Sequence, residues 1–300
     1  MSLQQLVDYF NDRFAQEHSF DFRPLVLQAG SVSGLFGKNR LDSVLTPVRE
    51  RANPSFIAGH KAKLVTSPNF FHQQQTFEIE NLLSCEPGQQ KIDFSSIINF
   101  DRLCRTVHLL NWLGVSYRNS FLCLEVDPRH IIGVKHHHGT YFEETVLHCG
   151  LETKNVVISL SASGIHEVHH HELLKGLNNY RDCGYKIALN IGHLISADRI
   201  LNLIKLLSPD FVCVTAPHEN YGNLAQHPTL SSALRQLQEM VSSLGGEIIF
   251  QEVTQPEQDL CATQIGFNFV QGAYYEKLSK PNAGLVSHKR QVREYSYANS

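Results

Sequence analysis

The sequence predicts an α/β fold, either a (β/α)8 barrel or a doubly wound open sheet. Residues 121–281 contain five consecutive strand–helix units, and their strands are apolar on both faces, as in a parallel sheet covered by helices. The chain has 300 residues, of which 42% are hydrophobic and 18% charged, which is enough for a large core. No break in composition divides this region, so we expect one main domain.

The N-terminal third gives weaker patterns. Residues 3–16 predict an amphipathic helix, because their apolar side chains recur on one face. Residues 22–27 predict a strand, and Gly30–Gly34 predict a Gly/Ser turn. Residues 41–100 are rich in proline and contain a Gln-rich stretch, so we expect irregular structure there. Residues 100–113 predict a helix.

The remaining elements alternate regularly. The expected strands are 121–126, 155–160, 185–190, 210–215, 247–252 and 267–271. The expected helices are 141–149, 171–183, 198–207, 227–244 and 256–265. In a barrel, the carboxyl ends of these strands would surround one mouth, where active sites of such barrels lie.

Composition excludes several classes of function. The chain has 26 Lys and Arg against 29 Asp and Glu, a formal net charge of −3, which gives no electrostatic case for nucleic acid or an anionic membrane. No apolar run reaches the roughly 18 residues of a membrane span. The polar N-terminus is not a signal peptide. The seven cysteines are scattered without a CxxC pair, so we expect reduced thiols, a cytoplasmic protein and no zinc site.

Five segments, in order, resemble the EAL domain, a bacterial family that hydrolyses cyclic di-GMP on a TIM-like barrel. The segments are FRPLV (22–26), LEVDPRHI (124–131), GYKIAL (184–189), FQEVTQPEQ (250–258) and VQGAYY (270–275). The resemblance implies a TIM-like (β/α)8 barrel of EAL type with a short N-terminal helix. It divides the chain into a helical extension (1–19), an EAL-like barrel (20–284) and a polar C-terminal tail (285–300).

The resemblance also implies where catalytic residues would stand. EAL domains hold two divalent ions with acidic and amide side chains at the strand ends, and the ions activate the attacking water. Nine of these positions are substituted in this chain, and only the glutamine of the closing motif, Gln271, is kept. The substituted positions are Phe36, Glu125, Ser159, Asn190, Ile191, Cys213, Thr215, Gln251 and Thr254.

These substitutions predict that catalysis is lost. Mg²⁺ and Mn²⁺ need hard oxygen ligands, and carboxylates supply most of the compensating charge. Glu125 alone would not hold two ions, and Cys213 replaces the lysine that the family places beside the attacking water. We therefore expect no metal, no cofactor and no phosphodiesterase activity. The first hypothesis is a non-catalytic EAL-like signalling protein that binds a partner protein in a cyclic di-GMP-related pathway.

Two alternatives stay open, an active metal-dependent phosphodiesterase and a metal-free cyclic di-GMP receptor. Arg40 matches the arginine that follows the EAL triplet, so it is either a phosphate ligand, with Gln271, or a surface charge. Because Arg40 is the only cation that the resemblance places near the site, we expect cyclic di-GMP to bind more weakly than about 10 μM. A homodimer is an open possibility.

Histidine-rich segments are the other candidates for a site. His136–His138 is one, and His166 with His169–His171 is the other. His166 and His170 are spaced i, i+4 and could share an adventitious metal on a helix. We interpret both segments as solvated polar surface. Polar residues at the strand ends could instead form a new site, although a vestigial pocket is the simpler interpretation; they are Glu125, Asp127, Asn190, His193, Glu252 and Gln271.

Overall fold

The computed structural model describes residues 1–17, 23–37, 39–68, 94–117, 119–133, 138–217 and 227–279. The Gln-rich stretch, His136, His137 and the predicted polar tail (285–300) lie outside these residues.

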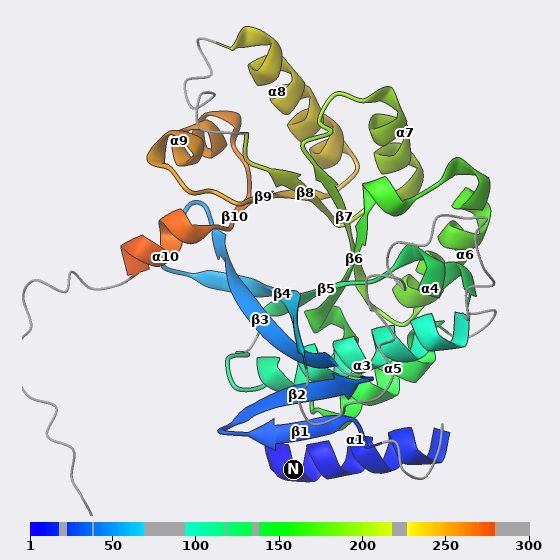
Figure 1. Ribbon diagram of the computed structural model, residues 1–300. Coiled ribbons are helices and arrows are strands. Elements are labelled where there is room, and N and C mark those ends of the chain that lie inside the picture. The colour runs from blue at the N-terminus through cyan, green and yellow to red at the C-terminus, as the bar shows by residue number, and fades with distance from the viewer. Residues whose placement is uncertain are drawn as a thin grey trace, which may run out of the picture.

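Eight strands close into a barrel, which confirms the predicted fold class (Figure 1). The ring begins with β3 (Asn39–Glu50) and β4 (Ile57–Pro68), which pair antiparallel. From β4 onward each strand pairs in parallel with the next, and β10 closes the ring on β3 in the antiparallel sense. These further strands are β5 (Phe121–Glu125), β6 (Val156–Ser161), β7 (Lys186–Gly192), β8 (Phe211–Thr215), β9 (Glu247–Gln251) and β10 (Phe269–Val270).

Helices cover the outside of the barrel (Figure 1). They pack on the outward-facing residues of the strands and form the main hydrophobic core with them. These helices are α3 (Phe94–Trp112), α4 (Pro128–Gly133), α5 (His138–His148), α6 (His170–Asp182), α7 (Asp198–Leu207), α8 (Pro228–Ser243), α9 (Pro256–Ile265) and α10 (Ala273–Ser279), with short 3₁₀ turns at Thr153–Asn155, Ala162–Gly164 and Glu167–His169.

A hairpin extends the sheet beyond the ring. Strands β1 (Leu25–Gln28) and β2 (Ser31–Phe36) pair antiparallel with each other, and β2 pairs with the first residues of β3. One face of this extension packs against α1 (Leu3–Glu17) and α3 and forms a second hydrophobic core. Asn11 of α1 closes the outer edge of the hairpin, because its amide donates to the Leu25 carbonyl at 2.9 Å and accepts from the Leu25 N–H at 2.8 Å.

The inside of the barrel is packed with side chains up to its mouth. Phe121, Phe211 and Phe269 contact one another at one level, with ring centroids 5.2–5.9 Å apart. Gly59 makes room for this aromatic layer, since a Cβ there would lie 2.5 Å from the Phe121 ring. A third core cluster contains these interior residues together with Cys123, Val157, Ala188, Cys213 and Ile249. The barrel is therefore a filled core whose polar residues are confined to the mouth.

The structure corrects the expectations for the N-terminal third. Residues 41–100 were expected to be irregular, but they contain most of β3, all of β4 and the start of α3. Pro47 fits inside β3 because β10 pairs only with Arg49 and Glu50, which leaves that edge of the strand open at Pro47. The turn expected at Gly30–Gly34 occupies only Ala29 and Gly30, and β2 follows it. From residue 121 onward the expected strands are confirmed to within a few residues.

Candidate functional site

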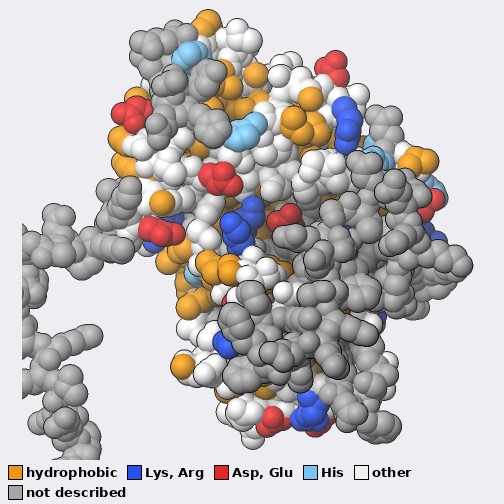
Figure 2. Space-filling view, in the orientation of Figure 1, with side chains coloured by type: hydrophobic (Ala, Val, Ile, Leu, Met, Phe, Trp, Pro, Cys, Tyr) orange, Lys and Arg blue, Asp and Glu red, His pale blue; other side chains and the backbone are white. Residues whose placement is uncertain are grey.

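The polar residues of the barrel lie at the carboxyl ends of its parallel strands. Alternation along each strand places every second residue inside, so Lys61, Ser159 and Asn190 face the mouth above the apolar interior. Thr215 and Gln251 are aligned on the neighbouring strands β8 and β9. The structure thus brings together most of the positions that the resemblance singled out. Figure 2 shows basic and acidic side chains near one another at the centre of the face that it draws.

Lys61 is the residue that sequence reasoning missed. It lies on β4, half-buried, and its Nζ donates to Gln251 Oε1 at 2.8 Å. The Gln251 amide then donates to Asn190 Oδ1 at 2.9 Å and to Thr215 Oγ1 at 3.1 Å. Gln251 is therefore the centre of a hydrogen-bonded group that joins four strands of the barrel, and the Lys61 ammonium stands at one end of it.

Two cysteine thiols lie beneath this chain of hydrogen bonds. Burial is the main cause that raises the pKa of Cys213 to about 11, while the nearby Lys61 charge lowers it and the Glu125 charge raises it further. Burial likewise raises the pKa of the Cys123 thiol, against a lowering by Lys61. Both thiols are therefore protonated at neutral pH, and neither is an activated nucleophile. The Lys61 charge acts on the pKa of both thiols and the Glu125 charge on that of Cys213 alone, which agrees with the position of both charges near the mouth.

Ser159 and Gln271 complete the mouth. Ser159 is 1% exposed, and its hydroxyl has no hydrogen-bond partner among the described residues. The side-chain Oε1 of Gln271 accepts from the Glu252 N–H at 3.3 Å. Glu252 holds a left-handed backbone with φ 62°, a strained conformation for a side chain other than glycine. Gly272 follows Gln271 because a Cβ at that position would lie 2.1 Å from the Val253 carbonyl oxygen.

Three other expected positions face elsewhere. Ile191 is buried in the core between the barrel and its helices, so it does not reach the mouth. Thr254 is exposed and precedes Gln255, the N-cap of α9, and its N–H and hydroxyl both donate to Gln258 Oε1. Asp127 pairs with Arg129 at 2.6 Å. Glu125, in contrast, is exposed at the end of β5 on the same strand face as the interior residue Cys123, so it lies at the rim of the mouth.

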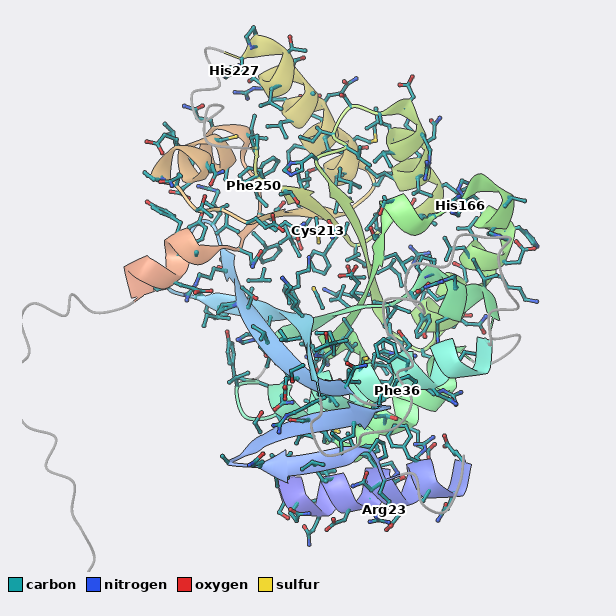
Figure 3. All side chains as sticks on the ribbon, in the orientation of Figure 1. Arg23, Phe36, His166, Cys213, His227 and Phe250 are labelled. Atoms are coloured by element: carbon teal, nitrogen blue, oxygen red, sulfur yellow. The ribbon has the colours of Figure 1, made fainter. Side chains whose placement is uncertain are left out.

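Phe36 and Arg40 do not belong to the site, contrary to the sequence-based expectation. Phe36 lies on β2, outside the ring, and packs against Phe100 with ring centroids 5.2 Å apart. Figure 3 shows Phe36 far from Cys213, which points into the ring. Arg40 binds Asp42 and Gln28 on the sheet extension. It lies six residues along extended β3 from Thr46, the residue that pairs with Lys61, a length of roughly 20 Å.

The ring position next to β5 is filled by β4, not by β2. The resemblance had been anchored on FRPLV, which leads into β1, and this choice moved the expected glutamate position onto the hairpin. The signal that could have identified β4 as the ring strand was a lysine, next to His60, in the stretch Ile57–Ala62, whose other residues are apolar or small.

The histidine segments form no metal site in the described part of the chain. No group of three or more His, Cys, Asp or Glu residues able to hold a metal occurs among the described residues. His166, His169 and His171 are exposed near the start of α6, and Figure 3 places His166 at the periphery, away from Cys213.

A buried polar cluster lies outside the barrel, between α3, α4 and α6. Arg105 forms an ion pair with Asp101 at 2.5 Å and donates to Tyr180 Oη at 3.1 Å. Arg105 also contacts His130 Nε2 at 3.0 Å. Burial raises the pKa of Asp101 to about 6, although the adjacent Arg105 charge lowers it. This cluster fixes helix packing and does not open onto the mouth.

Comparison with solved structures finds EAL domains. The BlrP1 protein of Klebsiella pneumoniae, in a calcium and cyclic di-GMP complex, gives a TM-score of 0.57 at 15% identity, covering 78% of this chain and 54% of that one. The YkuI protein of Bacillus subtilis, with an EAL domain in complex with substrate c-di-GMP and calcium, gives 0.58 at 16% identity, covering 80% and 55%. The FimX EAL domain of Xanthomonas citri, in complex with c-diGMP, gives 0.58 at 12% identity, covering 90% and 91%.

At these identities the likeness establishes the fold, which is that of EAL domains. The chain spans only 54% and 55% of the lengths of BlrP1 and YkuI. No protein-family model and no curated protein matches the sequence. Among the described residues, no helix combines the length and apolar character that crossing a membrane would require.

Proposed function

We propose that this chain is a non-catalytic protein of EAL fold that acts in cyclic di-GMP-related signalling by binding a partner protein, and that it does not hydrolyse the nucleotide. The observation that carries the proposal is the hydrogen bond between Lys61 Nζ and Gln251 Oε1 at 2.8 Å. It places a positive charge among the positions where the EAL resemblance expects metal ligands, and an amide where it expects a carboxylate.

The physical argument rests on charge. Two unit charges 4 Å apart interact by about 4 kcal/mol at an effective dielectric constant of 20, and a divalent ion doubles that repulsion. The neighbours of Lys61 in the hydrogen-bonded chain are neutral amide and hydroxyl groups, which do not offset a second cation. Glu125 supplies one carboxylate at the rim, too few for the two ions that the hydrolytic mechanism of the family uses.

The link to cyclic di-GMP rests on the fold. The solved neighbours described above are complexes with that nucleotide, and their fold is the one found here. Without a hydrolytic centre, the protein's output has to come from what it binds. That reasoning favours a regulatory partner protein over a product of catalysis.

A hydrolysis assay tests the proposal. The purified protein is incubated with cyclic di-GMP and Mg²⁺ or Mn²⁺, next to an active EAL phosphodiesterase as the positive control, and the linear product is measured by chromatography. We expect no turnover, and no Mn²⁺ binding by calorimetry. The variant Lys61→Glu should gain weak Mn²⁺ binding without gaining turnover, because one carboxylate does not rebuild a two-metal centre. Turnover that is abolished by Glu125→Ala would overturn the proposal.

A further inference from the structure

We propose that the outer edge of β4 pairs with the same edge of a second copy of this chain, so that the sheets of two barrels join into one continuous sheet. The edge consists of residues 62–67, and the two-fold axis passes through Val65. The inference goes beyond the proposed function and does not depend on it, because it involves neither the barrel mouth nor a different partner protein.

The outer half of β4 has one side without a neighbouring strand. Strand β4 pairs with β5 only through Gly59–Lys61, whereas its pairing with β3 continues as far as Pro68. Beyond Lys61, no other strand in the described part of the chain lies alongside β4. An unpaired row of N–H and C=O groups is a template for pairing with another strand.

The backbone geometry shows which residues face this open side. The Glu50 N–H donates to the Phe56 carbonyl at 3.2 Å, so the even-numbered residues of β3 form hydrogen bonds with β4. The bulge between these strands adds its extra residue to β4, which leaves the alternation along β3 unbroken. The partners of the even-numbered residues in outer β4 are odd-numbered, among them Val65. Leu64 and Thr66 therefore point their backbone groups away from β3, toward the open side.

The structure closes the other two open edges of this sheet extension but not that of β4. Asn11 occupies the outer edge of β1 by binding both backbone groups of Leu25. Pro47 removes a donor from the edge of β3 that lies open between β2 and β10. Natural sheets protect free edges from pairing by such means. Strand β4 contains no proline before Pro68, so its edge is able to pair over residues 62–67.

A two-fold axis at Val65 gives a consistent antiparallel register. Leu64 then stands opposite Thr66 of the second copy, and Thr66 opposite Leu64, so that both outward-pointing pairs form hydrogen bonds. Val65, which is 41% exposed, meets its own copy in the close position between these pairs. Lys63 stands opposite Ser67 of the second copy, so no like charges face each other across the contact.

The neighbouring registers are less favourable. An axis at Leu64 would require the backbone of Ala62 to pair, and this residue is only 4% exposed. An axis at Thr66 would place Leu64 opposite Pro68, which has no N–H to donate. The sequence of the edge therefore favours a single register.

Disulfide trapping tests this register. The two Val65 Cα atoms would lie about 4.5 Å apart, within the range that a disulfide spans. We expect Val65→Cys to form a disulfide-linked dimer when the purified full-length chain is mildly oxidised, seen on a non-reducing gel. Val44→Cys is the matched control, because Val44 is 48% exposed on the same sheet face but lies on β3, away from the open edge. The control should form little linked dimer.

Thr66→Pro tests the hydrogen bonds of the edge. Symmetry removes two N–H donors from the contact at once, so the dimer dissociation constant, measured by sedimentation equilibrium, should rise about tenfold or more. Thr66→Ala keeps the N–H and should change that constant by less than about twofold. The Thr66 N–H points away from β3, so Thr66→Pro should leave the circular dichroism spectrum of the chain unchanged.

Three results would overturn the inference. They are a monomer at every concentration, equal trapping in Val65→Cys and Val44→Cys, and a dimer that Thr66→Pro does not weaken. None of them bears on the proposed function, which the hydrolysis assay tests separately.

Discussion

The Arg105 guanidinium should be the costliest single charge to remove from this protein. Arg105 and Asp101 are 2% and 7% exposed, and their charged atoms lie 2.5 Å apart. The Arg105 side chain also packs over the Phe142 ring, 4.6 Å from its centroid. Removing one partner of a buried ion pair leaves the other charge without compensation, which costs about 3–5 kcal/mol. We expect Arg105→Met to lose that much stability at pH 7.5.

The stability lost in Arg105→Met should be smaller at acidic pH, because it depends on the ionisation of Asp101. Its folded-state pKa of about 6 lies above the unfolded value of 3.8, so the folded state binds the proton more tightly. The free energy of unfolding therefore decreases as the pH rises from about 4 to above 6 and Asp101 ionises. Arg105 stabilises the Asp101 side chain by charge only when that side chain is a carboxylate. Without Arg105 its pKa rises further. A rise of one unit adds about 1.4 kcal/mol to the cost at pH 7.5 and almost nothing at pH 5.

Urea unfolding at pH 5 and pH 7.5 measures both quantities. Arg102→Met is the matched control on the same helix, because the Arg102 side chain is partly exposed and its ion pair with the partly exposed Glu17 spans 3.9 Å. That change should cost less than about 1 kcal/mol at either pH. Equal losses for the two arginines, or a larger loss for Arg105→Met at pH 5 than at pH 7.5, would refute the reasoning.

Three further changes test other parts of the structure. Burial lowers the pKa of His108 from 6.5 to about 4, so the unfolded state takes up the proton at a higher pH than the folded state. The free energy of unfolding should therefore decrease as the pH falls from 6.5 to 4, by up to about 3 kcal/mol. His108→Gln should remove this pH dependence, which urea unfolding between pH 4.5 and 7 measures. Gly59→Ala would place a Cβ within 2.5 Å of the Phe121 ring and should cost about 1–3 kcal/mol of stability. The melting temperature should fall, and an unchanged melting temperature would contradict the packing of the aromatic layer. Asn11→Ala leaves the N–H and carbonyl of Leu25 without their side-chain partner and should cost about 1–3 kcal/mol in chemical unfolding, whereas a neutral effect would show that water replaces both bonds.

The second half of the fold could be predicted because each element there carries its own signal. Strands such as Phe211–Thr215 are buried on both faces, so their sequence is continuously apolar and stands out from the amphipathic helices around it. Helix α9 begins at Pro256 after a capping residue and ends at Gly266 with a left-handed backbone, which are local signals that tertiary contacts do not override.

The first half could not be predicted because its strands have mixed environments. Strand β3 is partly in the ring and partly in the extension, so its burial pattern along Asn39–Glu50 has no single period. Pro47 inside it argues against a strand until the open edge is known. Lys61 was missed for the same reason, since a charged residue in an unrecognised strand gives no sign that it faces the interior of a barrel.

Four of the positions near the mouth share one property. Each lies within a strand that the sequence marks clearly, so counting along that strand fixes the direction of its side chain; they are Ser159, Asn190, Cys213 and Gln251. Counting along the strands does not show which of these side chains form hydrogen bonds with one another. Lys61 reaches Gln251 from a separate part of the chain, 190 positions away in the sequence.

Helix α3 belongs to both large hydrophobic cores, and this affects where the chain can be cut for expression. Its residues Leu103 and Val107 pack in the core shared with α1, while Leu109 and Trp112 pack in the core against the barrel. A fragment that starts at residue 20 would therefore lose α1 and expose one face of a helix whose other face is still needed. Such a fragment should aggregate, and soluble production requires the N-terminal helix even though it adds nothing to the mouth.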